Sequence, residues 1–202
     1  MGIVRWLVVA AMLACAPMPA VAADEPDHAI HEALRAVLRD AVAAIDGGRY
    51  GDLLPLLTEN VEVTSVTQEV MSGRADVTRY FDEWFGPKGY MKSMTMKMDA
   101  DKLTDLTPDK RWGLVRGKAL EHYEAKDGDV FDFATRWTAV MLRGDDGRWR
   151  IRAIHFGTNH LDNPVLTKVT KTLERYAFYA AFGGLGLGLI VGYGWGRRRR
   201  AA

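Results

Sequence analysis

Three histidines in the central part of the sequence could act as general acids or bases: His122, His155 and His160. Histidine is the usual side chain for proton transfer because its pKa lies near neutrality. His155 stands in a segment that alternates apolar and polar residues, so it faces either a pocket or the opposite surface of a strand. A packed, hydrogen-bonded histidine is the simpler interpretation. The sequence therefore offers His122 and His155 as candidates and assigns no catalytic residue.

A metal site would need three or four converging ligands. Among potential ligands of the central region, only His155, His160 and Asp162 stand close together in the sequence. The single cysteine, Cys15, lies in an N-terminal apolar run. The chain after this run has no thiolate ligand, disulfide or cysteine nucleophile. We therefore predict no metal ion and no cofactor.

Four methionines, Met91, Met94, Met96 and Met98, gather in one short segment. In an exported protein, thioethers could bind Cu(I). The last three, however, alternate with polar residues and so share one face of a strand. Methionines that face a core or an adaptable apolar pocket need no metal. We favour this second interpretation.

Aromatic residues are numerous enough to surround an apolar or aromatic ligand, although most aromatic side chains in such domains belong to the core. No serine-nucleophile motif, phosphate-binding loop or carboxylate pair stands out. The candidates for lining a pocket are Tyr80, Trp84, His122, Trp137, His155 and Phe156.

The elements that must position these side chains begin with helices. Apolar residues recur at three- and four-residue steps over 29–45, which predicts an amphipathic helix that ends at Gly47-Gly48. A second, short helix is expected over 50–57 and a third over 75–85. Residues 60–67 alternate as a strand does.

After Gly89 the hydrophobic period changes to two residues, which is typical of strands. Asp127-Gly128 and Asp145-Asp146-Gly147 mark hairpin turns. Helices first and antiparallel strands afterwards predict an α+β fold, with the helices on one face of the sheet. The later strands are expected over 91–101, 111–126, 129–143 and 148–160.

Residues 1–23 have the organisation of a secretory signal peptide. Arg5 gives a basic start, an apolar stretch follows, and Ala20-Val21-Ala22 is a small-x-small cleavage site. The apolar stretch is too short to cross a bilayer. Lipidation of Cys15 is the alternative, because Met12-Leu13-Ala14-Cys15 loosely resembles a lipobox.

Residues 176–196 carry no charge and are long enough for a transmembrane helix. Arginines follow directly, and because such residues stay cytoplasmic, 197–202 is predicted to be a cytoplasmic basic tail. The domain at 24–166 then lies outside the cytoplasm, followed by a juxtamembrane linker at 167–175. We therefore predict an inner-membrane protein with a periplasmic domain.

Small residues recur every four positions along the predicted span. On a helix they form one smooth stripe, which would allow close contact with a second helix. The alternative is ordinary composition, since glycine is common in membrane helices. The members of this glycine stripe are Ala180, Gly184, Gly188, Gly192 and Gly196.

Four stretches, at 45–63, 73–76, 136–142 and 147–152, carry a family resemblance. In their order and spacing the chain resembles the nuclear transport factor 2-like superfamily, in its SnoaL-like branch. The resemblance implies a cone-shaped, curved antiparallel sheet on three N-terminal helices, with a pocket at the open end, and a homodimer. Members include isomerases, dehydratases, polyketide cyclases and non-catalytic binding or assembly domains, so the fold does not settle the function.

Ketosteroid isomerases, one group in this superfamily, use an aspartate base opposite a tyrosine and a protonated aspartic acid. Aligned with this chain, those positions fall at Ser65, Ala41 and Ala139. None of these residues can take over the role, so the resemblance does not extend to that mechanism.

The charge distribution argues against nucleic acid as a partner. The formal net charge is +1, and the acidic residues lie between Asp24 and Glu174, whereas a basic run stands at 197–200. Nucleic-acid binding needs a basic face on the domain. We expect a membrane-tethered, non-catalytic binding or assembly domain with a pocket for a small apolar ligand. The alternative is a lyase or isomerase with His155 or His122 as acid–base, which would need that group inside the pocket.

Overall fold

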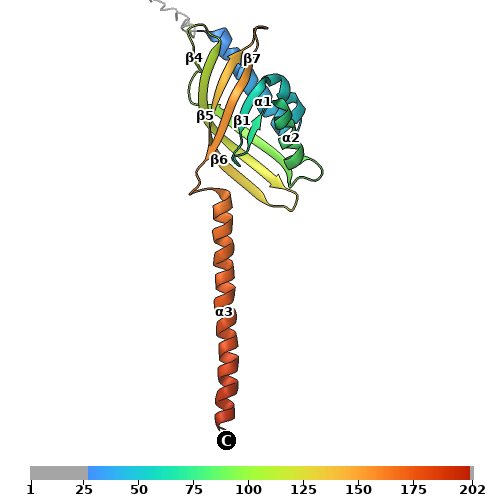
Figure 1. Ribbon diagram of the computed structural model, residues 1–202. Coiled ribbons are helices and arrows are strands. Elements are labelled where there is room, and N and C mark those ends of the chain that lie inside the picture. The colour runs from blue at the N-terminus through green and yellow to red at the C-terminus, as the bar shows by residue number, and fades with distance from the viewer. Residues whose placement is uncertain (1–26, 201–202) are drawn as a thin grey trace, which may run out of the picture.

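The computed structural model describes residues 27–200 of the chain. The predicted signal peptide, residues 1–23, and the alternative lipidation site Cys15 lie outside the described residues. The described chain forms an α+β domain followed by one long helix (Figure 1). Its helical elements are α1 (His28–Asp46), the 3₁₀ helix η1 (Tyr50–Leu56), α2 (Arg74–Phe85) and α3 (Pro164–Arg200).

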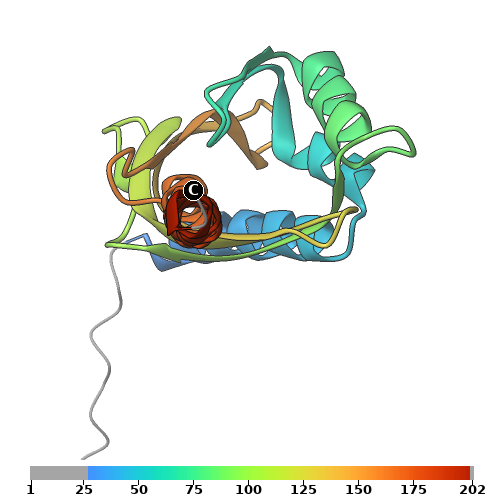
Figure 2. The ribbon, with the colours of Figure 1, turned by 90° about the horizontal axis from the view of Figure 1, so that it is seen from below.

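The strands form one curved sheet in the order β2-β1-β7-β6-β5-β3, and the short β4 pairs with β5. Figure 2 shows the sheet bending round, with α1 and α2 lying against it. This arrangement confirms the predicted α+β class, with a curved sheet on three N-terminal helices. The strands are β1 (Leu57–Thr64), β2 (Val70–Ser72), β3 (Met91–Ala100), β4 (Asp105–Leu106), β5 (Trp112–Ala125), β6 (Val130–Arg143) and β7 (Trp149–Thr158).

The sheet is mixed, because β1 runs parallel to β7 while the other pairs are antiparallel. An all-antiparallel sheet was expected, so this pair is a departure in detail. Parallel neighbours need a long crossover, and α2 with the intervening strands supplies it. As a result the last strand lies inside the sheet, where Val63 of β1 is opposite Ile154 of β7.

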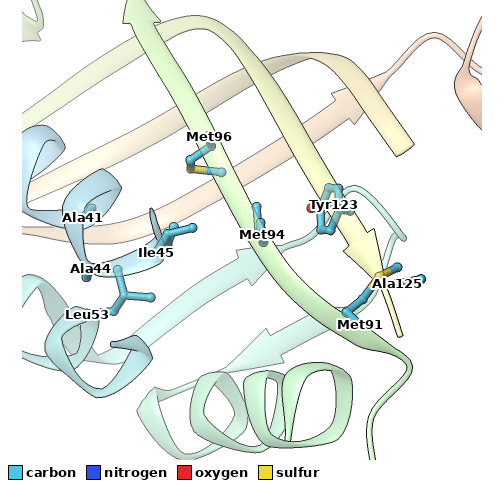
Figure 3. Close-up of a cluster of buried hydrophobic side chains, with 9 residues drawn as sticks. All are labelled: Ala41, Ala44, Ile45, Leu53, Met91, Met94, Met96, Tyr123 and Ala125. Carbon is cyan, nitrogen blue, oxygen red and sulfur yellow. The ribbon is translucent and has the colours of Figure 1, made fainter. Parts of the chain in front are cut away.

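Helix α1 buries one apolar face against the sheet. Leu34 and Val37 belong to one buried cluster, and Ile45 belongs to a second cluster with Met96 (Figure 3). The three- and four-residue spacing of these side chains places them on one side of the helix. The chain leaves the helix at Gly48, whose φ of 64° is a conformation that glycine adopts without steric cost.

Helix α3 continues without interruption from Pro164 to Arg200. The predicted linker at 167–175 is therefore helical, and the predicted span at 176–196 belongs to the same helix. Figure 1 shows α3 projecting from the domain as a single rod. Its segment Pro164–Arg197 is long and apolar enough to cross a membrane, as judged by length and composition.

The four glycines of the glycine stripe lie on this uncovered helix. At Gly184, Gly188, Gly192 and Gly196, an added Cβ atom would meet no described atom within 4 Å outside the helix's own nearby backbone. The stripe is thus open to whatever lies beside the helix.

Candidate functional site

A cavity of about 190 Å³ lies between the concave face of the sheet and the helices α1 and α2. We call it the central cavity. Most of its walls are apolar, so hydrophobic contact would hold an occupant there. The apolar lining includes Leu34, Val37, Ala41, Ile45, Leu53, Leu57, Val63, Val77, Phe81, Val115, Ile151 and Ile154.

Five methionines line the central cavity. Met94, Met96 and Met98 alternate along β3, so the pleat turns all three toward the cavity. Met71 of β2 and Met141 of β6 approach from other strands. Unbranched thioether side chains fill irregular space and adjust to an occupant. The methionines therefore give the cavity a deformable apolar wall.

One acidic side chain is buried in this apolar setting. Glu121 of β5 is 3% exposed and lines the central cavity. The hydroxyl of Tyr123 donates to its Oε2 over 2.6 Å, and the hydroxyl of Thr135 on β6 donates to its Oε1 over 2.6 Å. We call these three residues the Glu121 cluster. Each carboxylate oxygen thus has a donor, as a buried charge requires.

Burial dominates the electrostatics of the Glu121 cluster. Loss of solvent raises the pKa of the Glu121 carboxyl, while the hydroxyls of Thr135 and Tyr123 act in the opposite direction. Burial, and then the charge of Glu121, raise the pKa of the Tyr123 phenol. Tyr123 therefore remains protonated and keeps donating, and Glu121 is the titratable member of the cluster.

A second polar group lies elsewhere on the cavity wall. Tyr80 of α2 lines the cavity together with Ser65, and burial raises the pKa of the Tyr80 phenol to about 12. Ser65 follows β1 and is buried, with its hydroxyl 2.7 Å from that of Thr67. The Thr67 hydroxyl donates in turn to Glu69 over 2.8 Å. This chain of hydroxyls connects the cavity wall to the surface.

The structure brings three of the six predicted pocket residues to the central cavity, namely Tyr80, Trp137 and Phe156. Trp137 is 3% exposed, and its indole N–H donates to the carbonyl of Lys118 over 3.1 Å. Trp84 lies outside the lining, because its indole N–H donates to the carboxylate of Glu69 over 2.9 Å.

His122 and His155 lie outside the cavity lining. His122 follows Glu121 on β5, so its side chain projects from the opposite face of the sheet. There its Nδ1 is 2.7 Å from Oδ1 of Asp132, and this hydrogen bond raises the pKa of the imidazole. His155 is exposed on β7, between Ile154 and Phe156, which both line the cavity.

Another histidine does reach the cavity. His31 of α1 is 6% exposed and belongs to the lining. It lies near the start of the described chain, outside the central part of the sequence from which the histidine candidates were taken. The positions of the ketosteroid isomerase triad, Ser65, Ala41 and Ala139, line the same cavity and carry no acid or phenol there.

Metal ligands do not gather in the described part of the chain. Within residues 27–200, no three histidine, cysteine, aspartate or glutamate side chains come together in a way that could hold a metal ion. His155, His160 and Asp162 are exposed and do not form such a group.

Sequence reasoning missed Glu121, Tyr123 and Thr135. The segment 118–125 alternates, but both of its faces contain charged and apolar residues, so the inward face could not be identified from that strand alone. The pattern at 135–141 is clearer, since Trp137 and Met141 mark one face. Pairing β5 with β6 would have placed Glu121 on that face.

Solved structures with the same fold come from several bacteria. A putative aromatic ring hydroxylase from Novosphingobium aromaticivorans is 15% identical, with 64% of this chain and 89% of that chain covered and a TM-score of 0.56. A putative scytalone dehydratase from the same organism is 16% identical, with 63% and 83% covered and a TM-score of 0.53. A nuclear transport factor 2-like protein from Salmonella enterica is 12% identical, with 64% and 91% covered and a TM-score of 0.52.

The domain thus has the nuclear transport factor 2-like fold. Identities at this level establish the fold and leave the activity open. The sequence matches no protein-family model and no curated protein.

Proposed function

We propose that this protein binds a small, largely apolar molecule in the central cavity of a domain that α3 tethers to a membrane. The observation that carries the proposal is the cavity, which combines mostly apolar walls with one buried acid, Glu121. Small-molecule sites in proteins typically pair such walls with a few placed polar groups.

The cavity volume limits the size of the occupant. An apolar cavity of about 150 Å³ takes up benzene. A cavity of about 190 Å³ therefore suits a single ring with one small substituent. Long acyl chains and polycyclic molecules would need the walls to move apart.

Helix α3 and the arginines at its end support a position for the domain relative to the membrane. The helical turns between Pro164 and Arg175 would hold the domain about 18 Å from the start of the span, at 1.5 Å per residue. The arginines at 197–200 favour a cytoplasmic C-terminus. We infer an inner-membrane protein with an extracytoplasmic domain, paired as a homodimer.

Acid–base catalysis on the same ligand is the second candidate. Glu121 favours it, because it is a titratable group that faces the cavity and has a pKa raised by burial. Such an enzyme would be a lyase or isomerase, with Tyr123 beside the acid as a hydrogen-bonding partner. His122 and His155 have no place in this mechanism, since both lie outside the cavity lining.

Ligand uptake can be measured on the full chain in detergent. Methionine labelled with ¹³C at its methyl group would report from the cavity wall, because an aromatic ring shifts the resonances of nearby methyl groups. Titration with toluene should shift the resonances of Met94 and Met96. If no single-ring apolar compound moves these resonances, the binding proposal is wrong.

A matched pair of variants tests the location. Ala139 lines the cavity, whereas its neighbour Thr138 is exposed on the other face of β6. Ala139→Leu should fill the space and weaken toluene binding about ten-fold or more, and Thr138→Leu should leave binding unchanged. Equal binding by both variants, with unchanged circular dichroism, would place the ligand elsewhere.

Two further measurements separate the remaining alternatives. A bound compound that the wild type converts and Glu121→Gln does not would favour the enzyme, whereas a compound released unchanged favours binding alone.

For topology, alkaline phosphatase fused near Pro164 should be active, and the same enzyme fused after Ala202 should be inactive. The reverse pattern contradicts the proposed orientation.

A further inference from the structure

The Glu121 cluster can still accept hydrogen bonds from a ligand, but it has no further donor to offer. The two oxygens of an ionised carboxylate offer about four lone-pair positions. The hydroxyls of Tyr123 and Thr135 occupy one position on each oxygen. Lone pairs on Glu121 therefore remain for a ligand.

The same two hydroxyls have no hydrogen atom to spare. Each hydroxyl has a single hydrogen, and both hydrogens are directed at Glu121. The cluster can accept hydrogen bonds from a ligand but has none to donate in this arrangement. A ligand that complements it must bring an O–H or N–H donor.

Several other polar side chains on the cavity wall lie beside protein partners, and His31 of α1 also lines the cavity. The Ser65 hydroxyl lies close enough to Tyr80 to lower the pKa of its phenol, against the larger effect of burial. Two basic residues of the lining, Arg35 and Lys102, each pair with an acidic neighbour three residues away along the chain, over 2.7 Å and 2.8 Å. Among these groups, Glu121 is the buried acceptor whose two protein donors are both defined, so it is the place we assign to a polar group of the ligand.

The apolar part of the cavity favours a ring. The five lining methionines can place sulfur atoms against an aromatic edge, a contact that an aliphatic ligand does not gain. Phe81, Trp137 and Phe156 add aromatic walls, which stack on or meet the edge of another ring. The volume of about 190 Å³ admits one such ring.

From this combination we propose that the ligand is a small monocyclic phenol. Its ring lies among Met94, Met96 and Met98, and its hydroxyl donates to the carboxylate of Glu121. The proposal rests on the proposed function, because it assigns the chemical class of the molecule that the central cavity takes up. A hydroxyl donated to Glu121 also stabilises the ionised carboxylate against the cost of burial.

Phenol and toluene make a matched pair of probes, since they are nearly the same size and differ by a hydroxyl in place of a methyl group. Both would be titrated into the full chain in detergent, with the methionine methyl resonances as readout. Their partition into detergent is the same for every variant, so the ratio of their two Kd values can be compared between variants. Glu121→Leu should shift this ratio toward toluene by about ten-fold or more, because the phenol hydroxyl then loses its acceptor.

Glu124→Gln is the control, since Glu124 lies on the same strand with its side chain 39% exposed and paired with Lys92; it should leave the ratio unchanged. If Glu121→Leu does not fold, Glu121→Gln should shift the ratio in the same direction by a smaller factor.

The phenol proposal is overturned if toluene binds but the ratio stays the same in the Glu121 variants. It is also overturned if Glu121→Leu shifts the ratio of methoxybenzene to toluene, neither of which has a donor, as strongly as the ratio of phenol to toluene. Failure of both toluene and phenol to bind would instead remove the proposed function itself.

Discussion

The phenolic hydroxyl of Tyr123 donates a 2.6 Å hydrogen bond to Oε2 of Glu121, two residues earlier on β5. The pleat of the strand turns both side chains to the concave face of the sheet. Because burial and the neighbouring carboxylate raise the pKa of Tyr123, this donor stays protonated. Strand β5 therefore carries both the acid Glu121 and the donor for its Oε2. The donor for Oε1 of Glu121 is Thr135 of β6.

Removing the Thr135 hydroxyl should weaken the fold. Thr135→Val keeps the shape of the side chain but takes away the donor to Oε1 of Glu121. Hydrogen bonds to charged groups contribute about 1.5–3 kcal/mol, so we expect the free energy of unfolding to fall by about that amount near neutral pH. Urea unfolding of the full chain, followed by tryptophan fluorescence, measures it. Thr135→Ser retains the hydroxyl and should lose much less, and equal stability of Thr135→Val and the wild type would contradict the role of this bond.

The free energy of unfolding of the wild type, measured relative to that of Glu121→Gln, should fall as the pH rises. The pKa of Glu121 in the folded state is raised above the usual 4.5, so over the interval between the two values the folded chain binds more protons than the unfolded chain. The free energy of unfolding then decreases with rising pH from about 4.5 up to the folded pKa. Subtracting the curve of Glu121→Gln cancels the other carboxyl groups. A difference that is flat or increases with pH would show that burial does not control this acid.

His122 reports on the opposite face of the same strand. The hydrogen bond to Asp132 raises the pKa of the His122 imidazole above its usual value of 6.5. The protonated imidazole therefore stabilises the fold below pH 6.5, and this stabilisation disappears as the pH rises through the folded pKa. Asp132→Asn should lower the pKa of His122, as measured by NMR titration of the ring protons. Asp145→Asn, in the turn before β7, serves as the control. An unchanged His122 titration in Asp132→Asn would rule out the pairing in solution.

Local patterns in the sequence predicted most of the elements closely. The helix expected over 29–45 is α1, His28–Asp46, and the strand expected over 111–126 is β5, Trp112–Ala125. These boundaries follow from periodicity and from Gly47-Gly48 and Asp127-Gly128, which act within a few residues of the chain. Pairing between distant segments has no such local signal, and the parallel contact of β1 with β7 was accordingly missed.

The candidate site was harder to predict, because it depends on which face of a strand turns inward. His122 and Glu121 are adjacent in the sequence, so their side chains point to opposite faces of β5. Which of the two faces the cavity depends on which face of the strand turns inward. The sequence favoured histidine as the acid–base because its usual pKa lies near neutrality. The pKa of Glu121 is raised by burial, which arises only when the sheet is assembled. Trp137 and Phe156, which are large and apolar, line the central cavity.

The glycine stripe on α3 leads to a prediction about self-association. Residues four apart on a helix are separated by about 400°, so the stripe winds by about 40° at each step. Two helices that cross at an angle can follow such a path over a few members, with their backbones close together at the centre. Gly188 is the central member, and an added Cβ there meets no described atom within 4 Å. A side chain at this position would therefore point away from the rest of the described chain, toward whatever lies beside the helix.

Gly188→Leu should weaken association of the α3 segment 176–196 in a membrane two-hybrid reporter assay. In lipid there is little hydrophobic drive between helices, so association relies on the close packing that leucine at this position would prevent. Gly186→Leu is the matched control, because it makes the same change two residues away and off the stripe, and its Cβ also has open space. We expect the reporter signal to fall strongly for Gly188→Leu and little for Gly186→Leu. Equal losses, or no association of the wild-type segment, would leave the glycines as ordinary membrane-helix composition and remove this helix as a contribution to a homodimer.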